Sequence, residues 1–242
     1  MDPLTLVGLT LAVFATATLS GMVGMGGGVT LLAIMAATMP PPLVVPLHGV
    51  IQLFSNGTRA FLFLRHVHHR IFAFYMIPAG LGVFVGARWY VGSSLPWFKP
   101  VIGIFIIGYL ATVVRKPAAV RMPVWGFAIL GAVTGTAASL IGATGPLIAP
   151  FFLRDDITKE EVVATKAAVQ VVTHLAKLPA FFALGFAYGA WALELVPLCV
   201  AAVAGTMMGK RLLTRMDAEV FRRFFMVVLL AIAVHLIASG IG

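Results

Sequence analysis

Polar and basic side chains recur at helical spacing inside two otherwise apolar parts of this 242-residue chain. Both sets follow a spacing of 4, 3, 1 and 3 residues: His48, Gln52, Ser55, Asn56 and Arg59, then Lys166, Gln170, Thr173, His174 and Lys177. On a helix, residues at this spacing lie on one narrow face. A basic residue at the centre of a membrane helix costs about 2.5–3.5 kcal/mol and usually faces a site or a partner. The two stripes therefore predict a polar, positively charged centre.

Glycine-rich breaks precede both stripes, at 24–28 and at 142–146. Glycine permits a tight turn and leaves backbone N–H groups open. Pro146 suits the first position of a new helix, and Thr144 suits its cap. Each break then presents a helix N-terminus, whose free N–H groups and positive dipole end attract anions. The alternative is close helix packing through small residues, which is common in membranes.

No acidic residue is placed to neutralise the basic residues of the stripes. Every Asp and Glu lies at a terminus or a junction except Glu194, which we expect near the outer interface. The uncompensated charge favours an anionic substrate. We expect the substrate-binding residues at both breaks and on both stripes: Gly26, Gly27, Gly28, His48, Gln52, Asn56, Thr144, Gly145, Lys166, Gln170 and His174. The alternative for Arg59 and Lys177 is that their side chains extend to the membrane interfaces.

Other polar residues give little support to catalysis or metal binding. His66, His68 and His69 share a basic turn that lacks carboxylates or thiols to complete a metal site. A single cysteine excludes a disulfide framework and a thiolate zinc site. His48 and His174 are the only deep groups that titrate near neutral pH, which makes them candidates for proton coupling. We expect no catalytic residue, no cofactor and no metal, with coupling to protons or another ion left open.

The composition requires a membrane around these elements. Of all residues, 61% are hydrophobic and 10% are charged, whereas about a quarter of a soluble domain is charged. A net charge of +9 would suggest nucleic acid in a soluble protein, but membrane proteins collect Lys and Arg on the cytoplasmic side. Most of the basic residues fall in four junctions, at 65–70, 115–122, 154–161 and 210–223. The charge therefore indicates orientation, and no nucleic-acid partner is expected.

Ten apolar segments follow along the chain: about 4–22, 27–38, 43–64, 71–92, 98–114, 124–141, 146–153, 158–185, 190–213 and 219–240. A spanning helix needs roughly 20 apolar residues, so the second and seventh segments are too short to cross. With the basic junctions in the cytoplasm, the third to fifth segments run in, out and in. The eighth to tenth run out, in and out. The remaining pairs are then re-entrant hairpins, and both termini are external.

The two halves are related in sequence. A shift of 118 residues aligns positions 8–63 with the second half without a gap, and a shift of 123 extends the match. The matched pairs include Gly24/Gly142, Gly27/Gly145, Gln52/Gln170, Gly82/Gly205 and Gly86/Gly209. Inverted repeats with broken helices recur in secondary transporters. We expect an all-α integral membrane protein with a single membrane domain over 1–242. Repeat 1 covers about 1–116 and repeat 2 about 121–242, each a broken hairpin plus three transmembrane helices.

The glycine motifs resemble those of the sulfite exporter TauE/SafE family of membrane proteins. The resemblance rests on Gly-Met-Val-Gly-Met-Gly-Gly-Gly at 21–28, on Ser-Leu-Ile-Gly-Ala-Thr-Gly-Pro at 139–146, and on Gly82, Gly86 and Arg88. It covers essentially the whole chain in two halves. The second motif departs from the pattern, with Ala143, Thr144 and Pro146 where a fuller glycine run is usual. The resemblance implies transport of sulfur-containing anions, such as sulfite or sulfonates, generally outward. The residues alone indicate only a small anion.

The leading hypothesis is a secondary transporter, multi-pass in the inner cell membrane. Substrate would sit at the midplane between the two breaks, and alternating access would move it across. A passive anion channel would use the same positive interior. A membrane-embedded enzyme using His48 and His174 is the weaker alternative, because the chain lacks a carboxylate–histidine or Ser–His–Asp constellation. The expected partners are the small anion and membrane lipid, and a homodimer is left open.

Overall fold

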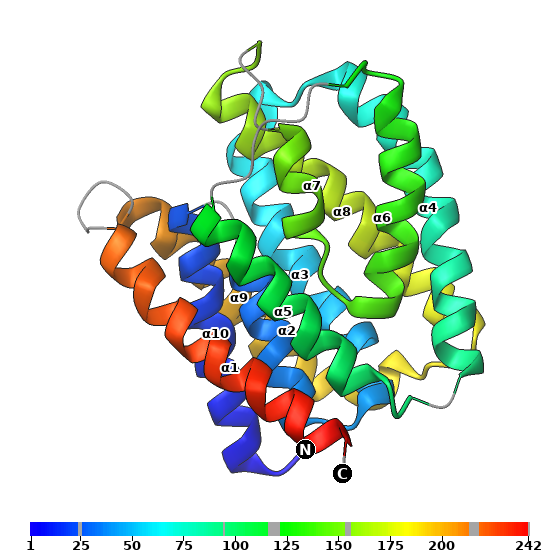
Figure 1. Cartoon of the computed structure of the whole chain (residues 1–242), viewed down its shortest axis with the longest axis vertical. Helices are drawn as coiled ribbons and strands as arrows, with labels where there is room; N and C mark the ends of the chain where they lie inside the picture. Colours follow the sequence, from blue (N-terminus) through cyan, green and yellow to red (C-terminus); the bar gives the residue numbers. More distant parts are fainter. Residues whose placement is uncertain (24–25, 94, 116–121, 153–155, 213–217, 242) are drawn as a thin grey trace.

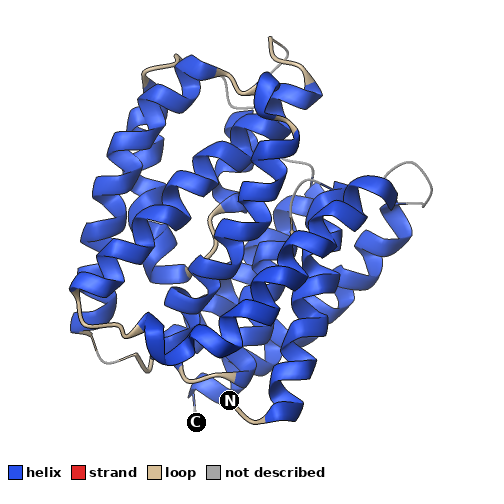
Figure 2. Cartoon of the chain, turned by 180° about the vertical axis from the view of Figure 1, so that it is seen from behind, coloured by secondary structure: helices blue, strands red, loops and turns tan. Residues whose placement is uncertain are grey.

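The two polar stripes lie on long helices of an all-helical bundle, seen in a computed structural model (Figures 1 and 2). The structure describes residues 1–23, 26–93, 95–115, 122–152, 156–212 and 218–241, and these contain no β-strand. Their α-helices are α1 Pro3–Val23, α2 Gly27–Thr38, α3 Pro41–Leu62, α4 His69–Gly92, α5 Phe98–Arg115, α6 Gly126–Ile141, α7 Gly145–Phe152, α8 Lys159–Ala183, α9 Ala192–Leu212 and α10 Ala218–Ile241. The expected all-α class is confirmed, and each expected segment agrees with a helix to within two residues.

The helices differ in whether they can cross a membrane. Three stretches in the described part are long and apolar enough: Pro3–Met22, His69–Gly92 and Tyr188–Leu212. α3 and α8, with 22 and 25 residues, are comparable in length to these three stretches. Their polar stripes lower the mean hydropathy of both helices. α2 and α7 have 12 and 8 residues, about 18 and 12 Å of helix, which is too short to cross. α1 is long enough to cross, although the sequence predicted it as one arm of a re-entrant hairpin.

α3 and α8 pack against each other in the centre and run antiparallel. Early in α3, a Cβ added at Gly49 would lie 3.1 Å from the Cδ of Lys177, which is late in α8. Late in α3, Ala60 packs in one cluster with Ala164 and Ala167, which are early in α8. Small residues at both places let the two backbones approach closely.

α4 packs along α6 through glycines. A Cβ added at Gly82 would lie 2.3 Å from the carbonyl oxygen of Ala132, and one added at Gly86 would lie 2.3 Å from that of Thr136. Ser139 adds a hydrogen bond from its hydroxyl to the Val83 carbonyl at 2.9 Å. Backbones meet this closely only where no side chain stands between them. α4 and α6 therefore form one tightly packed pair.

α1 and α9 form a second tightly packed pair. A Cβ added at Gly205 would lie 2.4 Å from the carbonyl oxygen of Phe14, and one added at Gly209 would lie 2.3 Å from that of Thr18. α9 also contacts α3, and α4 also contacts α8. The two pairs thus lie on opposite sides of the central α3–α8 pair, while α5 packs against α10 (Figure 1).

Both chain ends lie at one end of the bundle, and the turn between α3 and α4 lies at the other end (Figure 1). Beside that turn, the ammonium of Lys210 sits over the ring of Phe63, 4.9 Å from its centroid. The end of α9 and the end of α3 therefore meet, and each is followed by one of the basic junctions. This is the arrangement expected if both junctions face the same side of a membrane.

Candidate functional site

A small polar cavity of about 30 Å³ lies between the two stripes and the two breaks. Among the described residues its lining comprises Ser20, Gly26, Gly28, Val29, His48, Gln52, Asn56, Arg59, Ala143, Gly145, Pro146, Lys166, Gln170 and His174. One water needs about 10–15 Å³ of such volume. The cavity therefore has room for about two waters or a compact ion, and its walls come from both halves of the chain.

His48 holds the first break. Gly26 has φ 96° and precedes α2, a backbone conformation that glycine adopts without steric cost. From α3, the Nε2 of His48 lies 2.9 Å from the carbonyl oxygen of Gly28. A carbonyl only accepts, so Nε2 carries the proton. The Nδ1 of His48 has no hydrogen-bond partner among the described residues, which leaves it as a bare acceptor in the neutral ring.

Lys177 holds the second break. Gly142 ends α6 with φ 101°, and its carbonyl oxygen accepts a 2.8 Å hydrogen bond from the Nζ of Lys177. The Lys177 side chain has 0% exposure. The alternative that Lys177 extends to the membrane interface is therefore wrong, because its ammonium is directed inward onto the break.

Arg59 and Lys166 supply the charge of the cavity. Each is 6% exposed, and both line the cavity, so the interface alternative is also wrong for Arg59. The Nη1 of Arg59 donates weakly to the Oδ1 of Asn56 at 3.4 Å, and its Nε has no partner in the described part. No lining residue in that part is acidic. Two buried cations therefore lack a counter-charge.

Amides from both halves lie beside the helix starts. Asn56 donates its Nδ2 to the Oε1 of Gln52 at 3.2 Å and to the Gln52 carbonyl at 2.9 Å. A Cβ added at Gly28 would lie 3.2 Å from the Oε1 of Gln52, and one added at Gly145 would lie 3.1 Å from the Nε2 of Gln170. Each break thus meets the amide of its own half, whose N–H donors can bind an oxyanion.

Most of the expected site residues meet at this cavity. Those that line it are Gly26, Gly28, His48, Gln52, Asn56, Gly145, Lys166, Gln170 and His174. Gly27 lies outside the lining and packs on α1, where an added Cβ would come within 1.9 Å of the Thr16 carbonyl oxygen. Thr144 is also outside it, and its backbone carbonyl accepts from the N–H groups of Leu147 and Ile148 at 3.0 and 3.2 Å.

Sequence reasoning left five lining residues out of the site: Ser20, Val29, Arg59, Ala143 and Pro146. The sequence contains a signal for Arg59, because it belongs to the first stripe and matches Lys177 at the shift of 118. The sequence leaves Arg59 open between the site and the membrane interface, because Arg65 lies only six residues further on. Ala143 and Pro146 belong to the second break itself. Ser20 and Val29 carry no signal beyond their nearness to the first break.

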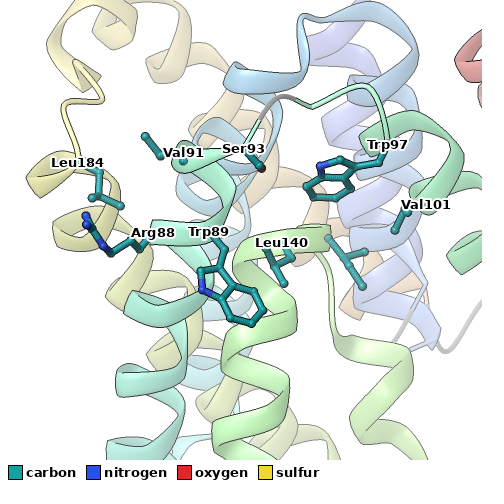
Figure 3. A pocket seen from close by; sticks show the side chains of 10 residues that line it. Arg88, Trp89, Val91, Ser93, Trp97, Val101, Leu140 and Leu184 are labelled. Carbon is teal, nitrogen blue, oxygen red and sulfur yellow. The ribbon is translucent and has the colours of Figure 1, made fainter.

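A larger hollow of about 780 Å³ opens beside the end of α6 (Figure 3). Trp89 comes from α4, Trp97 precedes α5, and Leu140 comes from the end of α6. Arg88 is its one charged residue among those described, and Figure 3 shows that side chain near Leu184 rather than between the tryptophans. Binding sites combine a pocket with convergent polar groups. The small central cavity has these groups, and the large hollow does not.

Comparison with known proteins agrees with this centre. The family model described as "Sulfite exporter TauE/SafE" matches residues 9–236, a range that includes both breaks and both stripes. No curated protein and no solved structure matches the chain. The family resemblance of the glycine motifs is therefore confirmed. This chain belongs to the sulfite exporter TauE/SafE family, and membership implies a membrane transporter of sulfur anions such as sulfite and points away from an enzyme.

Proposed function

We propose that the chain exports a small sulfur oxyanion or organosulfonate across the inner cell membrane as a secondary transporter. One observation carries the proposal: the buried Arg59 and Lys166 line a small central cavity that has no acidic residue among its described lining. Buried charges are normally paired. The partner that these two cations lack is an anion, which agrees with the family's sulfur anions.

The proposed binding site uses the cavity walls of both halves. The ammonium of Lys166 and the amides of Gln52 and Gln170 are the donors we assign to the anion's oxygen atoms. His48, Asn56 and His174 complete the side-chain wall. The remaining assigned residues, Gly26, Gly27, Gly28, Thr144 and Gly145, form or support the two helix starts. Preorganised donors of this kind bind an oxyanion without moving when it arrives.

We propose that the two halves are inverted repeats within one membrane domain, over about 1–116 and 121–242. The glycine contacts support this. Gly82 meets the carbonyl of Ala132, and Gly205 meets that of Phe14. The two glycines are 205 − 82 = 123 residues apart, and the two carbonyl residues are 132 − 14 = 118 apart. These are the two shifts that align the halves in sequence.

The second pair of glycine contacts obeys the same relation. Gly86 meets the carbonyl of Thr136, and Gly209 meets that of Thr18. The shifts are again 209 − 86 = 123 and 136 − 18 = 118. Chance similarity of glycine-rich helices would not preserve both shifts in both contacts. The α4–α6 and α1–α9 pairs are therefore our candidates for two equivalent bodies that rock around the cavity to give alternating access, with a re-entrant break in each half.

The test of the proposal is transport by the purified chain in liposomes. Counter-exchange of labelled sulfite should saturate with substrate concentration, because a carrier passes one ion per conformational cycle. Lys166→Ala should abolish sulfite binding and exchange while the chain stays folded. Arg88→Ala is the matched control, since that cation is exposed and lies outside the cavity. Flux that neither saturates nor exchanges would indicate a channel, and unchanged binding in Lys166→Ala would refute the site.

Orientation and coupling have separate tests. We propose that both termini are external, so cytoplasmic labelling of either end would refute the layout. We also propose coupling to protons through the rings of His48 and His174, which lie edge to face with their centroids 5.9 Å apart. A pH gradient should then drive net sulfite movement. His174→Gln should reduce the pH-driven movement more than it reduces counter-exchange, and an unchanged ratio of the two rates would exclude this histidine.

A further inference from the structure

We infer that Arg59 and Lys166 form a two-cation clamp at one end of the cavity, and that this clamp selects compact anions with two negative charges. The inference rests on the proposed transport function, and it narrows the substrate from sulfur anions in general to small dianions. It also gives Arg59 a direct role in specificity. The argument depends on the register of α3 against α8, on the partners of four basic residues, and on the size of the cavity.

The register places Arg59 and Lys166 at the same level. Gly49, next to His48, contacts Lys177 across the antiparallel pair. From residue 48 to 59 along α3, and from 177 back to 166 along α8, the chain advances by the same number of residues. Arg59 and Lys166 therefore face one level, about 16 Å along the helix axes from the level of His48 and Lys177. The packing of Ala60 with Ala164 and Ala167 at that end agrees with this register.

The other two basic residues are already engaged. His48 donates to the carbonyl of Gly28, and Lys177 donates to the carbonyl of Gly142. Each half thus uses one basic residue to hold its own break and leaves one directed into the cavity. The assignments are exchanged between the halves, because His48 matches Lys166 and Arg59 matches Lys177 at the shift of 118. Because of this exchange, Arg59 and Lys166, the two cations that do not bind a break, lie at the same end.

Two cations at one level repel each other, and buried charge is stabilised only by a partner. The other described residues of the lining, the histidines His48 and His174 among them, include no acid. A dianion compensates both cations, whereas a monoanion leaves one uncompensated. A cavity of about 30 Å³ also leaves no room for an organic tail.

Two pairs of ligands, each alike in shape but different in charge, separate the effect of charge on binding from that of shape. Methanesulfonate is sulfate with one oxygen replaced by methyl, and methanesulfinate relates to sulfite in the same way, so each pair keeps its geometry and loses one charge. Binding would be measured by calorimetry and by thermal shift on the full chain in detergent, at a pH where sulfite is doubly charged. We expect each dianion to bind at least about tenfold more tightly than its methyl counterpart, since a charged hydrogen bond is worth about 10- to 100-fold in affinity.

Variants of Arg59 and Lys166 test whether the clamp causes the preference for dianions. Arg59→Gln and Lys166→Gln, which keep a neutral hydrogen-bond donor that Lys166→Ala lacks, should each bind weakly with a dianion-to-monoanion ratio near 1. Arg59→Lys should keep most of the ratio. Arg88→Gln, outside the cavity, should match the wild type. Equal affinity of wild type for both members of a pair would overturn the inference and leave the proposed function standing, and this comparison needs no variant. Failure to bind any of the four ligands would instead refute the proposed site. A ratio unchanged in both glutamine variants would assign the preference to other residues.

Discussion

The two glycine breaks match in sequence but differ in what holds them. In the first, His48 from α3 binds the carbonyl oxygen of Gly28, the last residue of the break. In the second, Lys177 from α8 binds the carbonyl oxygen of Gly142, the first residue of the break. The shift of 118 matches His48 with Lys166 and not with Lys177. The two breaks are therefore held at opposite ends, by basic residues that do not match in sequence.

The glycines that match in sequence also differ in what they contact. Gly27 lies against the α1 backbone, with an added Cβ only 1.9 Å from the Thr16 carbonyl oxygen. Among the described residues, its match Gly145 meets only the end of the Gln170 side chain, at 3.1 Å. Backbone cannot move aside cheaply, whereas a flexible side chain can. The first break is thus built for tight helix packing, and the second leaves its glycine beside the cavity.

The largest effect we predict breaks this match between Gly27 and Gly145. Gly27→Ala forces a methyl group into the α1 backbone and should lower the free energy of unfolding by about 3 kcal/mol or more, at the upper end for overpacking. Gly145→Ala should leave stability nearly unchanged and weaken anion binding, because the methyl group displaces Gln170. Thermal unfolding in detergent and sulfite binding would be measured for both. Similar losses of stability in the two variants would show that the breaks are equivalent after all.

A second comparison lies within α8, between two buried lysines. Lys166 is 6% exposed and lines the cavity, whereas Lys177 is 0% exposed and donates to Gly142. Replacing either by Met removes a buried cation, so the gain from losing that charge is similar in both variants. Only Lys177→Met also breaks a charged hydrogen bond, which is worth about 1.5–3 kcal/mol.

We therefore predict that Lys177→Met is less stable than Lys166→Met by about 1.5–3 kcal/mol in the absence of anion. Lys166→Met should be as stable as the wild type or more so, because replacing an unpaired buried charge by an apolar group is often stabilising. Thermal unfolding without ligand measures this, and added sulfite should stabilise Lys177→Met but not Lys166→Met. Equal stability of the two variants would mean that the bond to Gly142 contributes nothing.

Much of the helical layout and of the cavity could be read from the sequence. Apolar segments have lengths set by helix geometry, and the stripe residues must share a face wherever their helix lies. The sequence match between the halves predicted a break at the same place in each half. The sequence therefore predicts His48, Gln52, Gln170 and Lys166, and all four line the cavity.

The sequence does not show which basic residues bind a break and which line the cavity. Whether a lysine holds a break or faces a cavity depends on the register of α3 against α8, which no local pattern encodes. Lys166 and Lys177 lie on one stripe and look alike in sequence. Likewise, Gly27 belongs to the same glycine run as Gly28, yet it packs on α1 while Gly28 lines the cavity. Long-range packing decides both cases.

The smallest effect we predict compares how the two central helices begin. α3 starts after Pro40 with no side-chain cap. α8 starts with a capping box, in which the Oγ1 of Thr158 accepts from the N–H of Glu161 at 3.2 Å and the Oε2 of Glu161 accepts from the N–H of Thr158 at 2.7 Å. That backbone N–H donor lowers the pKa of Glu161 below its ordinary 4.5. Only α8 should therefore depend on a cap residue and on pH.

Thr158→Ala should lower the free energy of unfolding by about 1 kcal/mol at neutral pH. The Glu161 carboxylate has a depressed pKa, so its contribution is full above pH 4.5 and is lost as the pH falls through the folded value. Glu161→Gln should therefore show a small deficit in Tm near neutral pH that shrinks in acid. Pro41→Ala in α3 is the control and should show no such pH dependence. A deficit in Glu161→Gln that stays constant into acid would mean that the ionised cap contributes nothing to the start of α8.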